Sequence, residues 1–372
     1  MQRNDDFTTE TEKYFAEKGL TLTPGQRFYR IPDKYFDLYG VFYDKETGKF
    51  LRMPQSVADS VNPTVSQLNA YTAGGRIRFS TDANRMSVTV RFDMLNVNCH
   101  ISALGSSGFM LLQETENEDG SISYKMAAQF IPGHYANVSD SSTPEGYSIE
   151  KYLPGEGMRN FILYMPTYND IKELVLGFPK DSNCCSGLKY RQDVKPLLYY
   201  GSSITEGGCA SRPDIPYQCF ISRWTNTDFI NLGFSAGALG EETMAEYLAS
   251  LDVSVFVCDY DHNAPNAEHL WATHERLFRI FRKKHPYTPV VFMSKPDFDT
   301  DPTAPLRREA VKNTYDKAEA EGDKNVYFVD GERLFGTTDR EICTVDGTHP
   351  NDIGFFRMAK TLYDELKKTD IL

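Results

Sequence analysis

The sequence contains no long apolar run, and no stretch approaches the roughly 18 continuous apolar residues that a membrane-spanning helix needs. Residues 1–6 are polar and no apolar stretch follows them, so we expect no signal peptide and a cytoplasmic location. The mean hydropathy is −0.47 over 372 residues, a length that suggests about two globular domains.

Positive charge is also scarce. The chain has 40 Lys and Arg residues against 52 Asp and Glu residues, and this net charge of −12 argues against a nucleic-acid or anionic-membrane partner. Its seven cysteines are odd in number and form no CxxC pair, so we expect reduced thiols rather than a disulfide framework. No group of His, Cys and Asp has the spacing of metal ligands, and we predict neither a metal nor another cofactor.

The first half of the chain has the pattern of an antiparallel β domain. Short alternating or apolar runs lie between turn signals, and a hairpin is expected around residues 44–48. The runs are residues 39–43, 50–53, 76–79, 86–92, 109–113, 123–127, 161–164 and 174–176. Their spacing predicts a β-sandwich or jelly roll over residues 1–190, in which the polar stretch 179–195 is interpreted as the linker.

The second half alternates between strand-like and helix-like runs. The strand candidates are residues 197–200, 229–232, 253–257, 290–293 and 326–329. Helical spacing lies between them, for instance in a helix whose first turn would hold Pro265. This alternation predicts a parallel sheet with helices on both faces, a three-layer α/β/α domain over residues 191–372. Active sites of such sheets lie at the carboxyl ends of the strands.

Two stretches of the second half have the residues that serine acyl transfer requires. Residues 201–207 (GSSITEG) follow the first strand, where a serine can expose its hydroxyl and nearby N–H groups can face negative charge. Asp346 and His349 lie three residues apart in a polar loop, so one loop can supply both a base and the carboxylate that orients it. Each stretch alone also fits ordinary loop and helix capping.

Two further polar stretches, residues 231–237 and 259–266, follow the second and third strands. Either can place a backbone N–H or an amide side chain beside Ser203. Taken in order, the four stretches resemble the SGNH (GDSL-type) hydrolase superfamily over residues 196–372. The resemblance implies a flavodoxin-like fold, with Ser203 as nucleophile, His349 as general base and Asp346 orienting it. It assigns the oxyanion to the N–H groups of Ser203 and Ala236 and to the side chain of Asn263.

The sequence departs from the family pattern at four positions. Ser202 stands where the family has aspartate, Ala236 where it has glycine, and Asp261 and Ala264 replace the glycine and aspartate of the third block. At position 236 the N–H survives, but a Cβ crowds the oxyanion site if the backbone there needs a positive φ.

Residues 39–43, 76–82 and 201–213 resemble one branch of the superfamily, in which a β-sandwich precedes the hydrolase domain. The Gly-x-Asp-Leu-Tyr motif of that branch is altered, and its nearest match is residues 108–112. A carbohydrate esterase family that removes acetyl groups has the same order of domains. The resemblance therefore implies an esterase of O-acetyl groups on a small-molecule or oligosaccharide substrate, for which Ser202, Arg212 and His262 are candidate contacts. The oligomeric state stays open, and a homo-oligomer is one of the alternatives.

Two alternatives remain. Residues 233–237 (GFSAG) also fit the G-x-S-x-G nucleophile elbow of α/β-hydrolases, which would make Ser235 the nucleophile. The departures at Ser202, Ala236 and Asp261 also fit a glycan-binding protein with a decayed hydrolase domain. We favour Ser203, because the acid and the histidine of an α/β-hydrolase usually come from separate loops.

Overall fold

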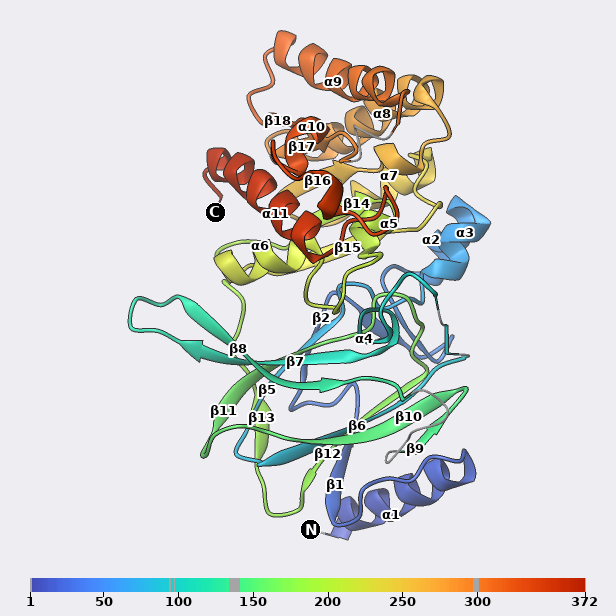
Figure 1. Ribbon diagram of the computed structural model, residues 1–372, viewed down its shortest axis with the longest axis vertical. Coiled ribbons are helices and arrows are strands. Elements are labelled where there is room, and N and C mark those ends of the chain that lie inside the picture. The colour runs from blue at the N-terminus through green and yellow to red at the C-terminus, as the bar shows by residue number, and fades with distance from the viewer. Residues whose placement is uncertain (1, 94, 97, 134–140, 297–300, 372) are drawn as a thin grey trace. The chain divides into compact units, whose positions relative to one another are not determined.

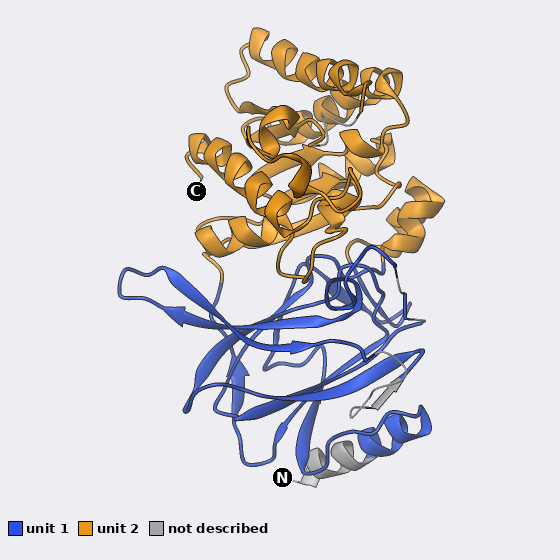
Figure 2. Cartoon of the chain, viewed as in Figure 1, with its two compact units in different colours: residues 1–51, 70–189 blue, residues 52–69, 190–372 orange. Residues whose placement is uncertain are grey.

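The computed structural model describes residues 2–93, 95–96, 98–133, 141–296 and 301–371. These residues fall into two compact units, which are coloured separately in Figure 2. Unit 1 comprises residues 1–51 and 70–189, and unit 2 comprises residues 52–69 and 190–372. This division differs from the expected one at residues 52–69, which lie in unit 2 although they come from the first half of the chain.

Unit 1 contains two antiparallel sheets (Figure 1). One has the strand order β1-β12-β6-β10-β9, and the other has the order β13-β5-β11-β7-β8 with β2 also paired to β5. The strands are β1 (Gln26–Arg30), β2 (Asp37–Tyr39), β5 (Arg76–Thr81), β6 (Arg85–Arg91), β7 (Phe109–Glu116), β8 (Ile122–Phe130), β9 (Ser141–Thr143), β10 (Gly146–Tyr152), β11 (Arg159–Tyr164), β12 (Glu173–Pro179) and β13 (Cys184–Ser186). The helices are α1 (Gln2–Glu17) and α4 (Ala103–Ser107), and the expected hairpin is formed by β3 (Phe42–Asp44) and β4 (Lys49–Leu51).

The core of unit 1 is made by the alternation that the sequence shows. Phe79 of β5, Val88 and Val90 of β6 and Phe161 of β11 are fully buried in one apolar cluster. Alternate residues of a strand point to the same face, so these side chains from both sheets meet between the two sheets. The antiparallel β domain expected from the sequence is confirmed.

The stretch expected to be a linker contains one more strand. β13 pairs with β5, with Cys184 opposite Thr81 and Cys185 opposite Ser80. A strand at the edge of a sheet has only one pairing partner and can remain polar. This explains why its sequence lacks the apolar alternation that identified the other strands.

Unit 2 contains a sheet of five parallel strands in the order β15-β14-β16-β17-β18. The strands are β14 (Leu197–Gly201), β15 (Phe229–Gly233), β16 (Val255–Asp259), β17 (Val290–Met293) and β18 (Val326–Val329). The longer helices are α6 (Tyr217–Thr225), α7 (Glu242–Leu248), α8 (Ala267–Lys284), α9 (Ala304–Ala320) and α11 (Asp352–Leu366), and the short ones are α2 (Gln55–Val61), α3 (Pro63–Leu68), α5 (Ser203–Glu206) and α10 (Gly331–Leu334). The order is that of a flavodoxin-like sheet, as the sequence predicted.

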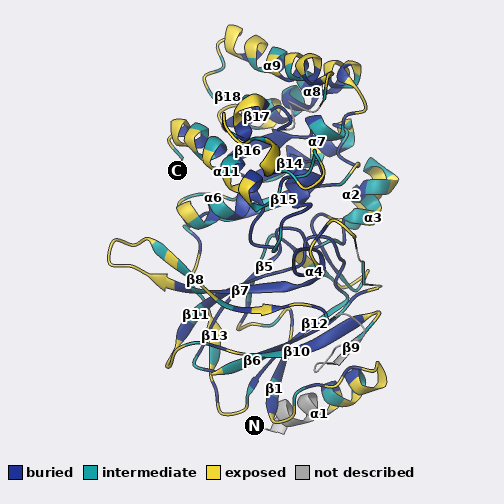
Figure 3. Cartoon of the chain, viewed as in Figure 1, coloured by how far each residue is buried: buried dark blue, intermediate teal, exposed yellow. Residues whose placement is uncertain are grey.

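Helices cover both faces of this sheet. Leu198 of β14 and Phe256 of β16 share a buried cluster with Leu277 of α8, whereas the Tyr199 ring lies 5.7 Å from the ring of Tyr217 in α6 on the other face. Figure 3 shows the strands as buried and the outer sides of α8 and α9 as exposed. No helix of the described ranges is long and apolar enough to cross a membrane.

Residues 52–69 belong to unit 2 because their apolar residues are buried there. Ala58 of α2 and Val65 of α3 are fully buried in the same cluster as Leu248 of α7. Asn62 caps α3, and its amide also donates to the carbonyl of Gly237 at 2.9 Å.

The start of α8 differs from the prediction. Its cap is Asn266, whose side chain accepts from the N–H of His269 at 2.8 Å. Pro265 therefore lies before the helix and not in its first turn, so that prediction was wrong. An asparagine satisfies a free N–H at a helix start, which proline cannot do.

Candidate active site

The candidate site begins where β14 ends. Its neighbours β15 and β16 lie on opposite sides of β14, which makes this edge the switch point of the sheet. A Cβ at Gly201 would overlap the Thr205 hydroxyl and the Asp259 carbonyl, so the tight turn needs glycine. Ser202 caps α5, because its hydroxyl accepts from the N–H of Ile204 at 3.1 Å. Ser203 is thereby the first residue of the helix.

Ser203 is joined to the predicted pair by hydrogen bonds. Its Oγ lies 2.9 Å from His349 Nε2, and His349 Nδ1 lies 2.8 Å from Asp346 Oδ2. An ionised carboxylate can only accept, so the proton between Asp346 and His349 belongs to Nδ1. Nε2 is then the acceptor for the Ser203 hydroxyl. The three residues, predicted from separate stretches, lie in contact.

The Asp346 carboxylate is also held by its own loop. Its Oδ1 accepts from the N–H groups of Thr348 at 3.0 Å and His349 at 2.8 Å. Burial acts to raise the pKa of Asp346, but the hydrogen bonds from the N–H and ring of His349 outweigh it and lower that pKa to about 2. The loop closes at both ends, since Thr344 bridges to Pro350 and Asn351 caps α11. It therefore presents an ionised carboxylate to the imidazole.

The backbone at Ala236 has the positive φ that the sequence analysis considered. Its φ is 55°, in the left-handed region that glycine tolerates best. The carbonyl of Phe234, two residues earlier, accepts from Asn263 Nδ2 at 2.6 Å. One of the two amide N–H groups of Asn263 thus fixes the loop that carries Ala236.

A buried ion pair lies on the other side of this loop. Arg52 pairs with Glu206 at 3.4 Å, and neither side chain is exposed. Arg52 also donates to the carbonyl of Gly233, and its guanidinium lies 4.3 Å from the centre of the Phe234 ring. Glu206 Oε2 accepts from the N–H of Ser235 at 2.9 Å and from its hydroxyl at 2.6 Å. Residues 233–235 are therefore held by two buried charges.

The cost of burying the Glu206 carboxylate is partly compensated by its neighbours. Burial raises the pKa of its carboxyl above the ordinary value, while the charge of Arg52 and the hydrogen bonds from Ser235 act to lower it. A buried carboxylate without these partners would be costly. The pair is therefore a single unit whose members depend on each other.

A second buried ion pair supports Asn263. Asp261 Oδ1 accepts from Arg307 Nε at 3.0 Å, and its Oδ2 accepts from the N–H of Lys295 at 2.8 Å. Arg307 also donates to the carbonyl of Ala264 at 2.9 Å. The residues on both sides of Asn263 are fixed in this way, so Asp261, which departs from the family pattern, has a structural partner.

Asp259 lies at the end of β16, beneath the short helix α5. Its carboxylate accepts from the hydroxyls of Thr205 at 2.9 Å and Tyr217 at 2.8 Å. Burial raises the pKa of Asp259 to about 7, against the lowering effect of these two hydrogen bonds. The turn after Ser203 is thus tied to the sheet by a carboxyl group that titrates near neutral pH.

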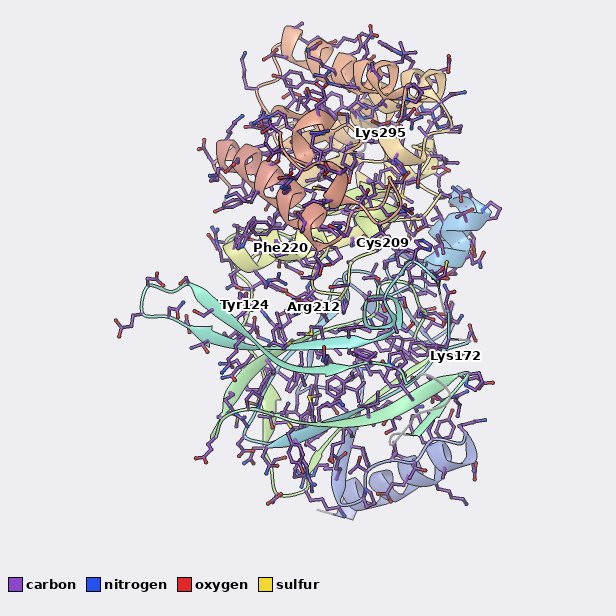
Figure 4. All side chains as sticks on the ribbon, viewed as in Figure 1. Tyr124, Lys172, Cys209, Arg212, Phe220 and Lys295 are labelled. Atoms are coloured by element: carbon purple, nitrogen blue, oxygen red, sulfur yellow. The ribbon has the colours of Figure 1, made fainter. Side chains whose placement is uncertain are left out.

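The candidate substrate contacts occupy different places. Ser202 is used as a helix cap, and Arg212, labelled in Figure 4, pairs with Asp214 at 3.2 Å. The ring of His262 lies edge-on to that of His349, with 6.4 Å between their centres. This ring contact places His262 beside the predicted pair.

The nucleophile-elbow alternative fits the structure less well. The hydroxyl of Ser235 donates to the carboxylate of Glu206, whereas the imidazole of His349 lies on Ser203. The strand order of the sheet is also the flavodoxin-like one. These contacts favour Ser203 over Ser235.

Sequence reasoning missed the groups that support the site. The sequence analysis assigns no role to three charged side chains, those of Arg52, Glu206 and Arg307. One signal was available, because Arg52 interrupts the apolar run from Phe50 to Met53. A charge within such a run indicates a buried and paired side chain.

Two family models match different parts of the chain. The GDSL-like lipase/acylhydrolase family model matches residues 194–367, and the model for the N-terminus of SGNH-hydrolase-type esterases matches residues 26–184. No curated protein matches the chain.

Solved structures match over most of the chain. A GDSL-like lipase from Bacteroides ovatus ATCC 8483 has 27% identity and a TM-score of 0.78, with 92% of this chain and 98% of that chain covered. A salicylyl-acyltransferase from a tetracycline biosynthetic pathway has 19% identity and a TM-score of 0.73, covering 94% and 99%. An active-site mutant of a family two carbohydrate esterase from Clostridium thermocellum has 14% identity and a TM-score of 0.60, covering 91% and 100%. The last two show a shared fold.

Proposed function

Because the chain belongs to the SGNH (GDSL-type) hydrolase superfamily, in the branch with an N-terminal β-sandwich, we propose that it is a serine esterase of small acyl groups. Its substrates are O-acetyl esters of carbohydrates. The observation that carries the proposal is the hydrogen-bonded series from Ser203 through His349 to Asp346. The carbohydrate part is supported by the shared fold with family two carbohydrate esterases.

The reaction uses the series in two halves. Ser203 Oγ attacks the ester carbonyl while its proton passes to His349 Nε2, and Asp346 stabilises the imidazolium. When the tetrahedral intermediate collapses, the bond to the leaving alcohol breaks and His349 returns the proton to the alkoxide. Water then attacks the acyl-enzyme, again with His349 as base, and releases the acid and the free serine.

The negative charge on the carbonyl oxygen needs donors that are already in place. The N–H groups of Ser203 and Ala236 and the amide of Asn263 fill this role. Loss of one such donor typically lowers kcat by about 100- to 1,000-fold. Arg52 and Glu206 act as positioning residues, since they hold residues 233–235 and thereby set the direction of the Ala236 N–H.

Hydrolysis of 4-nitrophenyl acetate in the presence of EDTA tests the proposal, with wild type compared to Ser203→Ala, Ser202→Ala and Ser235→Ala. We expect Ser203→Ala to lower kcat by about 10⁴-fold or more, because the nucleophile is lost. Ser202→Ala and Ser235→Ala lose only a cap and a loop contact, and each should keep at least about a tenth of the rate. Loss of hydrolysis in Ser235→Ala, together with retained hydrolysis in Ser203→Ala, would overturn the proposal. Release of acetate from acetylated oligosaccharides then tests the substrate class.

A further inference from the structure

Unit 1 has a groove of its own, apart from the residues of the candidate active site. It has a volume of about 670 Å³. Its walls are the end of β1 and the turn after it, the hairpin of β3 and β4, and the start of β12, where Lys172 is labelled in Figure 4. The lining residues are Arg27, Phe28, Tyr29, Arg30, Ile31, Pro32, Asp33, Lys34, Tyr35, Tyr43, Lys45, Lys172 and Glu173. Binding sites for small ligands commonly have volumes of about 300–1,000 Å³.

Three tyrosines give the groove aromatic surface. Tyr35 is 36% exposed, and its ring stands edge-on to that of Tyr29 with 6.0 Å between the centres. Tyr43 is half-buried and packs edge-on against Phe50 at 5.3 Å. Tyrosine offers an apolar ring with a polar tip, which suits a sugar ring with its C–H face and its hydroxyls.

The charge of the lining is opposite to that of the chain. Five cationic and two anionic side chains line the groove, whereas the chain carries a net charge of −12. Arg30 is paired with Glu173, and Lys172 is paired with Asp93. Within the described part of the chain, Arg27, Lys34 and Lys45 form no ion pair. Arg27 is hydrogen-bonded to Tyr29, and the Lys34 ammonium lies 4.8 Å from the centre of the Tyr35 ring, so no described carboxylate neutralises these charges.

We propose that this groove binds an anionic oligosaccharide, of the class that contains uronic acids. The tyrosine rings would contact the sugar rings, and Arg27, Lys34 and Lys45 would meet the carboxylates. Asp33 can accept hydrogen bonds from sugar hydroxyls. Its carboxylate would also repel a dense polyanion such as a polyphosphate, so a saccharide with isolated charges fits better. The proposal does not rest on the esterase activity, because every lining residue belongs to unit 1.

The test is titration calorimetry of the full chain with tetragalacturonate, with neutral cellotetraose as the matched ligand. We expect binding of tetragalacturonate that weakens with added salt, since salt screens exposed charges. Cellotetraose should bind about tenfold more weakly or not at all. Lys34→Glu/Lys45→Glu should weaken tetragalacturonate binding by about tenfold or more, because two attractions become repulsions. Tyr35→Ala should weaken it as well.

Lys125→Glu is the control, since Lys125 is exposed on β8 and does not line the groove. It should change the affinity by less than about twofold. The melting temperature of each groove variant should stay at the wild-type value, which shows that the variant is folded. No binding of tetragalacturonate at millimolar concentration, equal binding of cellotetraose, an unchanged affinity of Lys34→Glu/Lys45→Glu, or tighter binding of pyrophosphate would each overturn the proposal.

Discussion

The two sides of Ser203 are built in opposite ways. The acid–base side is one loop, in which Asp346 and His349 lie three residues apart and the side chains are 37% and 21% exposed. The oxyanion side depends on Arg52, Glu206 and Arg307, which are distant in the sequence and buried. In the proposed mechanism, the first side supplies the groups that transfer protons and the second side holds the donors for the oxyanion. A local, partly exposed pair can change without loss of the fold, whereas removal of one buried charge leaves its partner uncompensated.

The largest effect is expected on the acid–base side. Asp346→Asn keeps the size of the side chain but removes the charge that fixes the His349 tautomer, so kcat should fall by about 10⁴-fold. The melting temperature should change little, because the carboxylate is partly exposed. Steady-state kinetics and thermal unfolding of the same preparation measure both. A large fall in melting temperature together with a high residual kcat would contradict the local, catalytic role of this pair.

The next largest effect concerns stability. Arg52→Met leaves Glu206 without its partner and should lower the free energy of unfolding by about 3–5 kcal/mol. The kcat of the folded fraction should fall as well, because residues 233–235 lose their anchor, and Arg52→Lys should restore part of both. Lys312→Met, which breaks an exposed pair with Asp316, is the control and should cost less than about 1 kcal/mol. Equal losses of unfolding free energy in Arg52→Met and Lys312→Met would contradict the difference between the buried and the exposed ion pair.

A smaller effect concerns pH. The folded pKa of Asp259 is about 7, above the ordinary value, so the folded state holds its proton more tightly than the unfolded state. Its contribution to stability is fully present below about pH 4 and is lost as the pH rises to about 7. Asp259→Asn should remove this loss, on the order of a few kcal/mol. Urea unfolding from pH 4 to 8 measures it, and an unchanged slope in the variant would count against the assignment.

Asp346 should act in the reverse direction. Its folded pKa of about 2 is depressed, so its contribution is present above about pH 4 and is lost as the pH falls toward 2. The difference is measured by extending the unfolding series from pH 4 down to pH 2: wild type should lose stability as the pH falls through this range, whereas Asp346→Asn should not.

The smallest effect is expected at the strained position of the oxyanion loop. Ala236→Gly removes a Cβ from a residue with a φ of 55° and should stabilise the protein by about 1 kcal/mol or less. The rate should stay within about threefold of wild type, because the N–H is kept. Ala245→Gly, in the helix α7, should instead destabilise by about 1 kcal/mol. Destabilisation by both would show that the left-handed conformation carries no strain.

The part of the fold that the sequence predicted is the part in which local patterns are strong. The apolar strands of the parallel sheet and the alternating strands of the sandwich predict the observed architecture, and the proposed reacting residues follow a strand end or lie in one loop. The edge strand β13 was missed because its polar residues have one pairing partner. Residues 52–69 lie in unit 2 and not with the rest of the first half of the chain, and burial of Ala58 and Val65 against distant helices leaves no local pattern that predicts this.

The same reasoning explains the limits at the site. The family resemblance assigns Asn263 and Ala236, which follow strand ends, but the segments that carry them are held by buried charges that come together only in the fold. Asp261 looked like a sign of decay, and its pairing with Arg307 gives it a structural role instead. Charged residues in apolar surroundings are the signal that would have revealed this set.

The nucleophilic serine can be located directly by chemical labelling. Wild type is treated with a serine-directed phosphonate, and the labelled peptide from residues 196–240 is sequenced by mass spectrometry. We expect a single label on Ser203, absent from Ser203→Ala and much reduced in His349→Ala. A label on Ser202 or Ser235 that persists in Ser203→Ala would contradict this expectation.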